Sequence, residues 1–367
     1  MEPNIFKFPY TESVQDAFIA WMCECFNSNN EHKKKISELF IKELLGVDID
    51  FKRVKVEQQV KNIDILLTLD TDSEKEVNVI IEDKTDSCLH DDQLQKYVDK
   101  LDKRNQIYVV YYKTGHVNET ANTVFFDKEG YHYEPSIKSE ASQALGTLNV
   151  HKSKICKIKD IHDFFFQKNV LNLIRICHSE ILEDYVESIK FQYDSYYSDK
   201  VNRRDSKNII WGRIFEDLIK QAGKDFPGLL FANLAFYQGQ YWEIYVTRRI
   251  TENQNPEFNR SNNLFTEPIL NIRSDLFALK TPIIHFFHLP KEEKEGKYRN
   301  LRFNSKSQSY TLLFGRFKNT DLNNHSFQED NINIEDILLL FQAVCEEFNR
   351  LVIMGEENPF ELYLHDS

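Results

Sequence analysis

Two apolar runs separated by a polar segment constrain the fold of this chain more than any other feature. Residues 62–69 read NIDILLTL and residues 77–84 read VNVIIEDK. Both runs are rich in isoleucine, leucine and valine, and residues 70–76 between them (DTDSEKE) are polar or charged. This pattern is typical of two strands joined in a β-hairpin.

The register of this hairpin follows from its apolar side chains. Because successive side chains alternate between the two faces of a strand, the odd-numbered residues of both runs share one face. Pairing these faces places Ile65 opposite Ile81 and Leu67 opposite Val79. A slip of one residue would turn one apolar set to the wrong face, so the register is strongly specified.

The same register brings three charged side chains together on the opposite face. Asp64 lies opposite Glu82, and Lys84 shares the face of Glu82 because the two residues are two positions apart along the strand. Opposed carboxylates repel one another, and a divalent cation between them removes that repulsion. Mg²⁺ takes oxygen ligands, commonly one or two carboxylates with waters and substrate phosphates. An ammonium beside a metal-bound water completes the groups needed for metal-assisted phosphodiester hydrolysis.

A helix is expected after the hairpin, and it adds two residues to this pattern. Gln93 and Tyr97 are four residues apart and therefore lie on one face of that helix. The succession Asp64, Glu82-x-Lys84 and Gln93-x-x-x-Tyr97 resembles the PD-(D/E)xK nuclease superfamily. The glutamine and tyrosine are similar to those of its exonuclease and Cas4-like branch. The resemblance covers roughly residues 1–170.

The resemblance implies a metal centre. Its ligands would be the carboxylates of Asp64 and Glu82 and the backbone carbonyl of Asp83, with Mg²⁺ or Mn²⁺ as the cofactor. Glu57, on the strand before the hairpin, and Glu12, near the start of the first helix, resemble the additional acidic residues of some members.

The resemblance also implies roles in catalysis and binding. Lys84 would activate water or stabilise the transition state, and Gln93 and Tyr97 would support the site or contact nucleic acid. The proline in the superfamily's name is replaced here by Ile63. The expected activity is a nuclease that acts on DNA rather than RNA. A role in bacterial defence against foreign DNA follows by analogy alone.

Two other functions stay open at this point. A nuclease fold without turnover could bind nucleic acid or a partner protein, but binding alone gives no reason to keep Asp64, Glu82 and Lys84 together. A module that only binds proteins would fit the acidic composition, but it leaves the aligned charged residues unexplained.

The order of elements predicts an α/β (α+β) fold with two domains. In residues 1–170 the order β-β-β-α-β indicates a restriction-endonuclease-like mixed sheet flanked by helices. Residues 171–367 are expected to form a second α+β domain for substrate or partner recognition. It would comprise a helical connector (171–223), an antiparallel sheet (229–317) and a closing helix (334–352).

Composition limits the kinds of partner. The net charge of −12 and the pI of about 5.5 argue against a protein that coats DNA by charge alone, although a basic groove can be local. The candidates for such a groove, with plain solvated surface as the alternative, are Lys33, Lys34, Lys35, Lys52, Arg53, Lys55, Lys61, Lys152, Lys154, Lys157 and Lys159.

The cysteines and the apolar runs indicate the cellular compartment of the protein. The six cysteines form no CxxC pair, no apolar run is long enough to span a membrane, and the first residues lack a secretory signal. We therefore expect a cytoplasmic protein without membrane contact. The oligomeric state stays open, with a homodimer among the alternatives.

Overall fold

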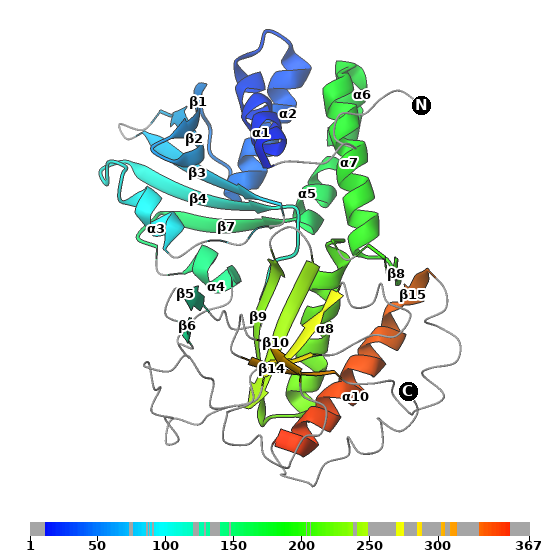
Figure 1. Ribbon diagram of the computed structural model, residues 1–367. Helices are drawn as coiled ribbons and strands as arrows, with labels where there is room; N and C mark the ends of the chain where they lie inside the picture. The colour runs from blue at the N-terminus through cyan, green and yellow to red at the C-terminus, as the bar shows by residue number, and fades with distance from the viewer. Residues whose placement is uncertain are drawn as a thin grey trace. The chain divides into compact units, whose positions relative to one another are not determined.

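The chain forms two compact units (Figure 1). The first comprises Met1–Val117 and Glu140–Tyr197, and the second comprises Asn118–Ser139 and Ser198–Ser367. The computed structural model describes residues 12–72, 76–85, 87, 89, 92–119, 125–127, 130–132, 140–146, 148–202, 204–205, 207–237, 241–248, 269–274, 285–287, 302–304, 309–313 and 330–352.

The first unit extends further along the chain than the boundary at residue 170 that we expected. Helices α6 (Lys168–Cys177) and α7 (Glu180–Tyr196) contribute Ile174 and Tyr185 to the same apolar core as the hairpin. The two helices are separate because His178, which follows α6, has a left-handed backbone with a φ of 48°.

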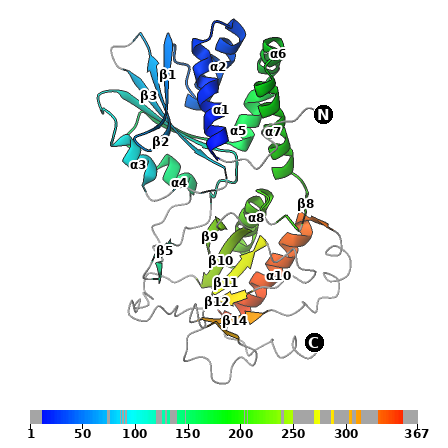
Figure 2. The ribbon, with the colours of Figure 1, turned by 45° about the horizontal axis from the view of Figure 1, so that its top comes forward.

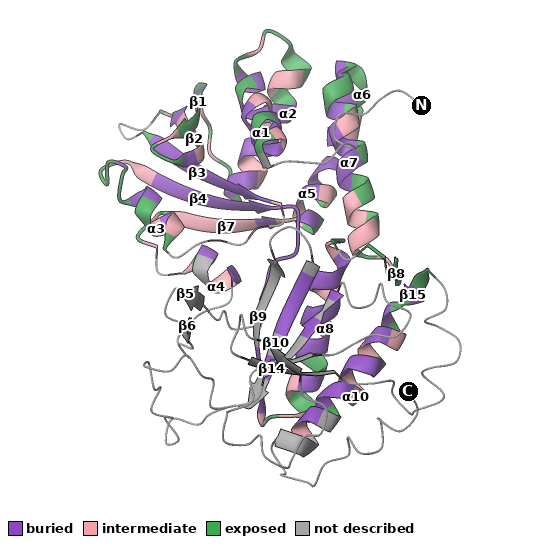
Figure 3. Cartoon of the chain, in the orientation of Figure 1, coloured by how far each residue is buried: buried purple, intermediate pink, exposed green. Residues whose placement is uncertain are grey.

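A five-stranded mixed sheet forms the centre of the first unit, as the sequence predicted. Its order is β1 (Arg53–Val60), β2 (Ile63–Asp70), β3 (Val77–Lys84), β4 (Gln106–Lys113) and β7 (Lys152–Lys157). Strands β1, β2 and β3 pair antiparallel, whereas β3, β4 and β7 run parallel. Strands β3 and β4 are the most deeply buried (Figure 3).

The predicted hairpin register is confirmed. Ile65 pairs with Ile81, and Leu67 pairs with Val79. All four side chains are fully buried in the larger core of the unit, so the apolar match that defined the register also fills the interior.

Helices cover both faces of this sheet (Figure 2). On one face lie α1 (Glu12–Glu24), continued by a 3₁₀ turn, α2 (Glu31–Leu45) and α5 (Ile158–Phe165), together with α6 and α7. On the other face lie α3 (Gln93–Val98) and α4 (Glu140–Leu145), which enclose a smaller apolar core.

Local signals set the ends of α2. The Asn30 side chain accepts hydrogen bonds from the backbone N–H groups of His32 and Lys33 and so caps the start of the helix. Gly46, with a φ of 61°, ends the helix in the left-handed conformation that glycine adopts without steric cost.

The second unit contains the expected antiparallel sheet and closing helix. The strand order is β13-β14-β12-β11-β10-β9, and two short strand pairs, β15-β8 and β5-β6, lie outside it. Its elements are β5 (Phe125–Asp127), β6 (Gly130–His132), β8 (Lys200–Asn202), α8 (Ile210–Asp225), β9 (Leu229–Tyr237), β10 (Tyr241–Arg248), β11 (Ile269–Arg273), β12 (His285–Phe287), β13 (Arg302–Asn304), β14 (Ser309–Leu313), β15 (Asn331–Asn333) and α10 (Ile334–Val352). Among the described helices of the whole chain, none combines the length and the apolar character needed to cross a membrane.

Candidate active site

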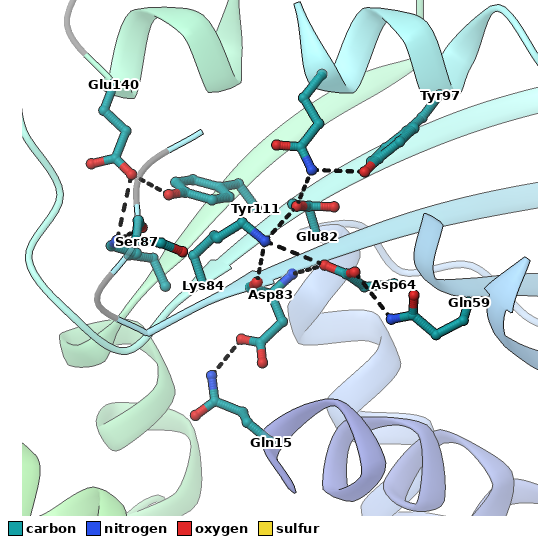
Figure 4. Close-up of polar contacts among 12 residues, drawn as sticks. Gln15, Gln59, Asp64, Glu82, Asp83, Lys84, Ser87, Tyr97, Tyr111 and Glu140 are labelled. Atoms are coloured by element: carbon teal, nitrogen blue, oxygen red, sulfur yellow. Dashed lines mark hydrogen bonds and ion pairs between the residues drawn. The ribbon is translucent and has the colours of Figure 1, made fainter. Parts of the chain in front are cut away.

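The ammonium of Lys84 lies among three oxygen atoms at the carboxyl end of β3 (Figure 4). Its Nζ is 2.7 Å from Glu82 Oε1, 3.6 Å from Asp64 Oδ2 and 3.0 Å from the backbone oxygen of Asp83. The convergence of the three charged side chains that the hairpin register predicted is therefore confirmed. These three oxygens are also the ones that the family resemblance implied as metal ligands.

Glu82 is the most perturbed member of this group. Its side chain is fully buried, and its Oε1 accepts hydrogen bonds from Gln93 and Lys84. Its other oxygen, Oε2, has no hydrogen-bond partner among the residues that the structure describes. Burial raises the pKa of Glu82 to about 8; the nearby Lys84 ammonium opposes this effect and the Asp64 carboxylate adds to it.

Helix α3 supplies the polar support expected from the sequence. Gln93 Nε2 is 2.5 Å from Glu82 Oε1 and 2.7 Å from the hydroxyl of Tyr97. About one turn of helix separates Gln93 from Tyr97, so both side chains lie on the face of α3 where Gln93 contacts Glu82 of β3. Burial raises the pKa of Tyr97, which keeps the hydroxyl protonated.

The side chain of Asp83 points to the opposite face of the sheet, where it is fully buried. It accepts a hydrogen bond from Gln15 of α1, and Gln15 Oε1 accepts one from the Thr114 hydroxyl at 3.2 Å. This polar chain fixes the Asp83 peptide against α1. The sequence held a signal for it, because Gln15 occupies a core position of the helical stripe that continues through Phe18 and Ile19.

A comparison with models of known families identifies this part of the chain. Residues 8–158 match the model of the PD-(D/E)XK nuclease superfamily. This part of the chain is similar to that superfamily. The matched segment contains the whole hairpin and α3. Comparisons with curated proteins and with solved structures gave no match.

The two acidic residues suggested as extra ligands lie on β1 and at the start of α1. The carboxylate of Glu57 lies 3.0 Å from Lys55 Nζ on the edge strand β1. Glu12 begins α1, and its side chain lies outside the part of the chain that the structure describes. The sequence missed Gln59, whose Nε2 is 3.3 Å from Asp64 Oδ1 (Figure 4).

The oxygen set around Lys84 fits a hard divalent cation with few protein ligands. Among the described residues, no group of three or more His, Cys, Asp and Glu side chains could hold a metal. Two carboxylates and one backbone carbonyl remain, which is the kind of partial shell that Mg²⁺ completes with waters and substrate oxygens. Oε2 of Glu82 adds to this shell a buried oxygen without a hydrogen-bond partner among the described residues.

Close backbone packing holds the end of β3 in the first unit. A Cβ atom at Gly115, just after β4, would overlap the carbonyl oxygen of Thr85, which follows Lys84. Beside it, the buried Lys113 donates to the carbonyl of Ser87, and its Nζ is 3.5 Å from Glu140 of α4. These contacts tie the segment after Lys84 to β4 and α4.

Proposed function

We propose that this protein is a divalent-metal-dependent nuclease that hydrolyses phosphodiester bonds in DNA. The observation that carries the proposal is the meeting of Asp64 Oδ2, Glu82 Oε1 and the Asp83 carbonyl oxygen around one positive charge. In a domain similar to the PD-(D/E)XK nuclease superfamily, such an oxygen set is suited to a catalytic cation.

Asp64 and Glu82, with the Asp83 carbonyl, would hold Mg²⁺ or Mn²⁺. Bound there, the ion would polarise a phosphoryl oxygen and lower the pKa of a bound water. Gln93 holds Oε1 of Glu82 and so leaves Oε2 directed to a ligand. Tyr97 fixes the orientation of Gln93, and Gln59 does the same for Asp64.

Lys84 supplies a positive charge that does not depend on the metal. Its ammonium already contacts both carboxylates, so it lies within reach of a phosphate bound to the same oxygens. In the transition state of hydrolysis, negative charge develops on the phosphoryl oxygens, and a fixed cation in a buried site stabilises it strongly.

The cysteines support a reducing compartment, which we propose is the cytoplasm. The five that the structure describes are buried and form no disulfide: Cys23, Cys25, Cys156, Cys177 and Cys345.

The proposal is tested by incubating the purified protein with supercoiled plasmid, linear duplex, single-stranded DNA and RNA. We expect cleavage with Mg²⁺ or Mn²⁺, none with EDTA, and preference for DNA. Lys84→Met should abolish cleavage while circular dichroism shows a retained fold. Lys190→Met, on the exposed surface of α7, is the matched control and should cleave normally.

Two results would reject the proposal. Cleavage by Lys84→Met at the rate of the unaltered protein would remove Lys84 from the chemistry. Metal-independent binding of DNA without cleavage under any condition would favour the alternative, a nuclease fold that only binds.

A further inference from the structure

Two lysines on neighbouring segments of the first unit hold each other in place. Lys61, in the turn between β1 and β2, donates from Nζ to the backbone oxygen of Lys100 at 3.0 Å. Lys100, just beyond α3, donates from Nζ to the backbone oxygen of Lys61 at 2.6 Å. Two ammonium groups are therefore fixed close together on the surface, and we name this pair the lysine clasp.

The charge of the lysine clasp is not neutralised by the protein. Both side chains are exposed, and neither pairs with a carboxylate among the described residues. The nearest acid along the chain, Asp99, instead accepts hydrogen bonds from Gln95 and Lys103. A carbonyl oxygen satisfies one donor of an ammonium without cancelling its charge, so donors stay available on each lysine.

The lysine clasp borders the candidate active site. Lys100 Nζ lies 5.1 Å from the centre of the Tyr97 ring, and the Tyr97 hydroxyl bonds to Gln93, which contacts Glu82. From the other side, Lys61 lies three residues before Asp64 on the turn into β2. Lys100 is thus connected to Glu82 through the side chains of Tyr97 and Gln93, and Lys61 lies three positions from Asp64 along the chain.

The turn that carries Lys61 is a two-residue hairpin turn. Lys61 and Asn62, between the paired residues Val60 and Ile63, have φ values of 56° and 63°, as the favoured turn of such a hairpin requires. Gln59 beside them also has a left-handed backbone, with a φ of 53°. Here they direct Gln59 to Asp64 and bring Lys61 to the end of α3.

Most other candidates for a basic groove are already engaged. Lys152 donates to the carbonyl of Gly46, and Lys33 and Lys34 lie over the rings of Trp21 and Phe26. Those paired with a carboxylate are Lys35, Lys52, Lys55, Lys154 and Lys159. Lys61 also has a carbonyl partner, as Lys152 does, but it differs in lying three positions before Asp64 at the start of β2.

We propose that the lysine clasp binds a backbone phosphate of the nucleic acid next to the one that is cleaved. The inference rests on the proposed function and adds to it a binding subsite for the substrate strand. Phosphate is the ligand that fits, because two exposed ammonium groups without a carboxylate form a site for a single anion with several acceptor oxygens. The Tyr97 ring under Lys100 keeps that side chain in position.

The test measures binding of fluorescent duplex and single-stranded DNA in EDTA, as a function of salt. In Lys61→Gln/Lys100→Gln, the slope of log affinity against log salt should become shallower by about 0.7–0.9, the value for one phosphate contact. The affinity advantage of the unaltered protein should then shrink about threefold between roughly 50 and 200 mM salt. The matched control is Lys168→Gln/Lys190→Gln, which removes the same charge from exposed positions of α6 and α7.

A charge-preserving variant separates binding from folding. Lys61→Arg/Lys100→Arg should keep the slope of the unaltered protein, even if its melting temperature falls. A purely structural clasp would lower the melting temperature of both clasp variants and leave both slopes unchanged, and this result would overturn the inference. An equal change of slope in the control would also overturn it, because net charge alone would then explain the effect.

Cleavage assays on the same proteins keep the two proposals distinguishable. If the unaltered protein cleaves DNA but the clasp variant binds with an unchanged slope, only the subsite is rejected. If cleavage is never seen but the slope changes as expected, the proposed function is rejected and the subsite stands. If the unaltered protein binds no nucleic acid, both are rejected.

Discussion

Replacing Glu82 by glutamine should stabilise the metal-free protein at pH 8 while removing its activity. The folded protein raises the pKa of Glu82 from 4.5 to about 8, mainly through burial. The unfolded chain releases this proton above about pH 4.5, whereas the folded state keeps it until about pH 8. Folding stability therefore declines as the pH rises through this interval and does not decline further above it.

The size of the effect follows from linkage. Each pH unit in this interval removes up to about 1.4 kcal/mol, so the range from 4.5 to 8 accounts for at most about 5 kcal/mol. In Glu82→Gln the group no longer titrates, so the stability profile should be flatter by up to about 4 kcal/mol between pH 5 and 8. The amide oxygen can still accept the hydrogen bonds from Gln93 and Lys84.

The assay is urea denaturation in EDTA at several pH values, followed by circular dichroism. Glu57→Gln is the control, since this carboxyl lies in the same sheet, is 34% exposed and pairs with Lys55. A surface pair of this kind contributes only about 0–1 kcal/mol, so its profile should parallel that of the unaltered protein. Parallel profiles for Glu82→Gln and the unaltered protein would refute the reasoning, because Glu82 would then be ionised at every pH tested.

Three further predictions concern the surroundings of the site. Gln15→Leu should cost about 1.5–3 kcal/mol in urea denaturation, because it removes a hydrogen bond to the buried carboxylate of Asp83. Gly115→Ala should lower both the melting temperature and the cleavage rate, because its Cβ displaces the carbonyl of Thr85. The control is Gly223→Ala, which has open space around its Cβ and should raise the free energy of unfolding by about 0.5–1 kcal/mol. Mg²⁺ at about 100 times its Kd should stabilise the unaltered protein by about 2.7 kcal/mol, and the absence of any such shift in thermal melting would contradict metal binding by the folded site.

The sequence predicted the parts of the site that follow from alternation. The apolar pairs Ile65–Ile81 and Leu67–Val79 fixed the hairpin register, and the positions of Asp64, Glu82 and Lys84 followed from it. Gln93 and Tyr97 were predictable for a similar reason, since helical spacing alone places them on one face.

What the sequence left undetermined depends on contacts between distant segments. Asp83 and Gln15 each look misplaced on an apolar face, and only the folded chain shows that they satisfy one another. The left-handed backbone at His178 and in the turn around Lys61 occurs without a glycine, so no glycine in the sequence predicts it. The approach of Gly115 to Thr85 requires the parallel pairing of β3 and β4, which the local sequence does not encode.

The two faces of the hairpin have separate consequences for how the protein tolerates change. The odd-numbered positions from Ile65 to Leu69 on β2 and from Val77 to Asp83 on β3 face the main core, whereas Asp64, Glu82 and Lys84 face α3. In a survey of random substitutions, changes in the first group should lower the amount of folded protein. Changes in the second group should leave the protein folded but without cleavage activity. Substitutions at Asp64, Glu82 and Lys84 alone would therefore remove catalysis in evolution while the fold is kept.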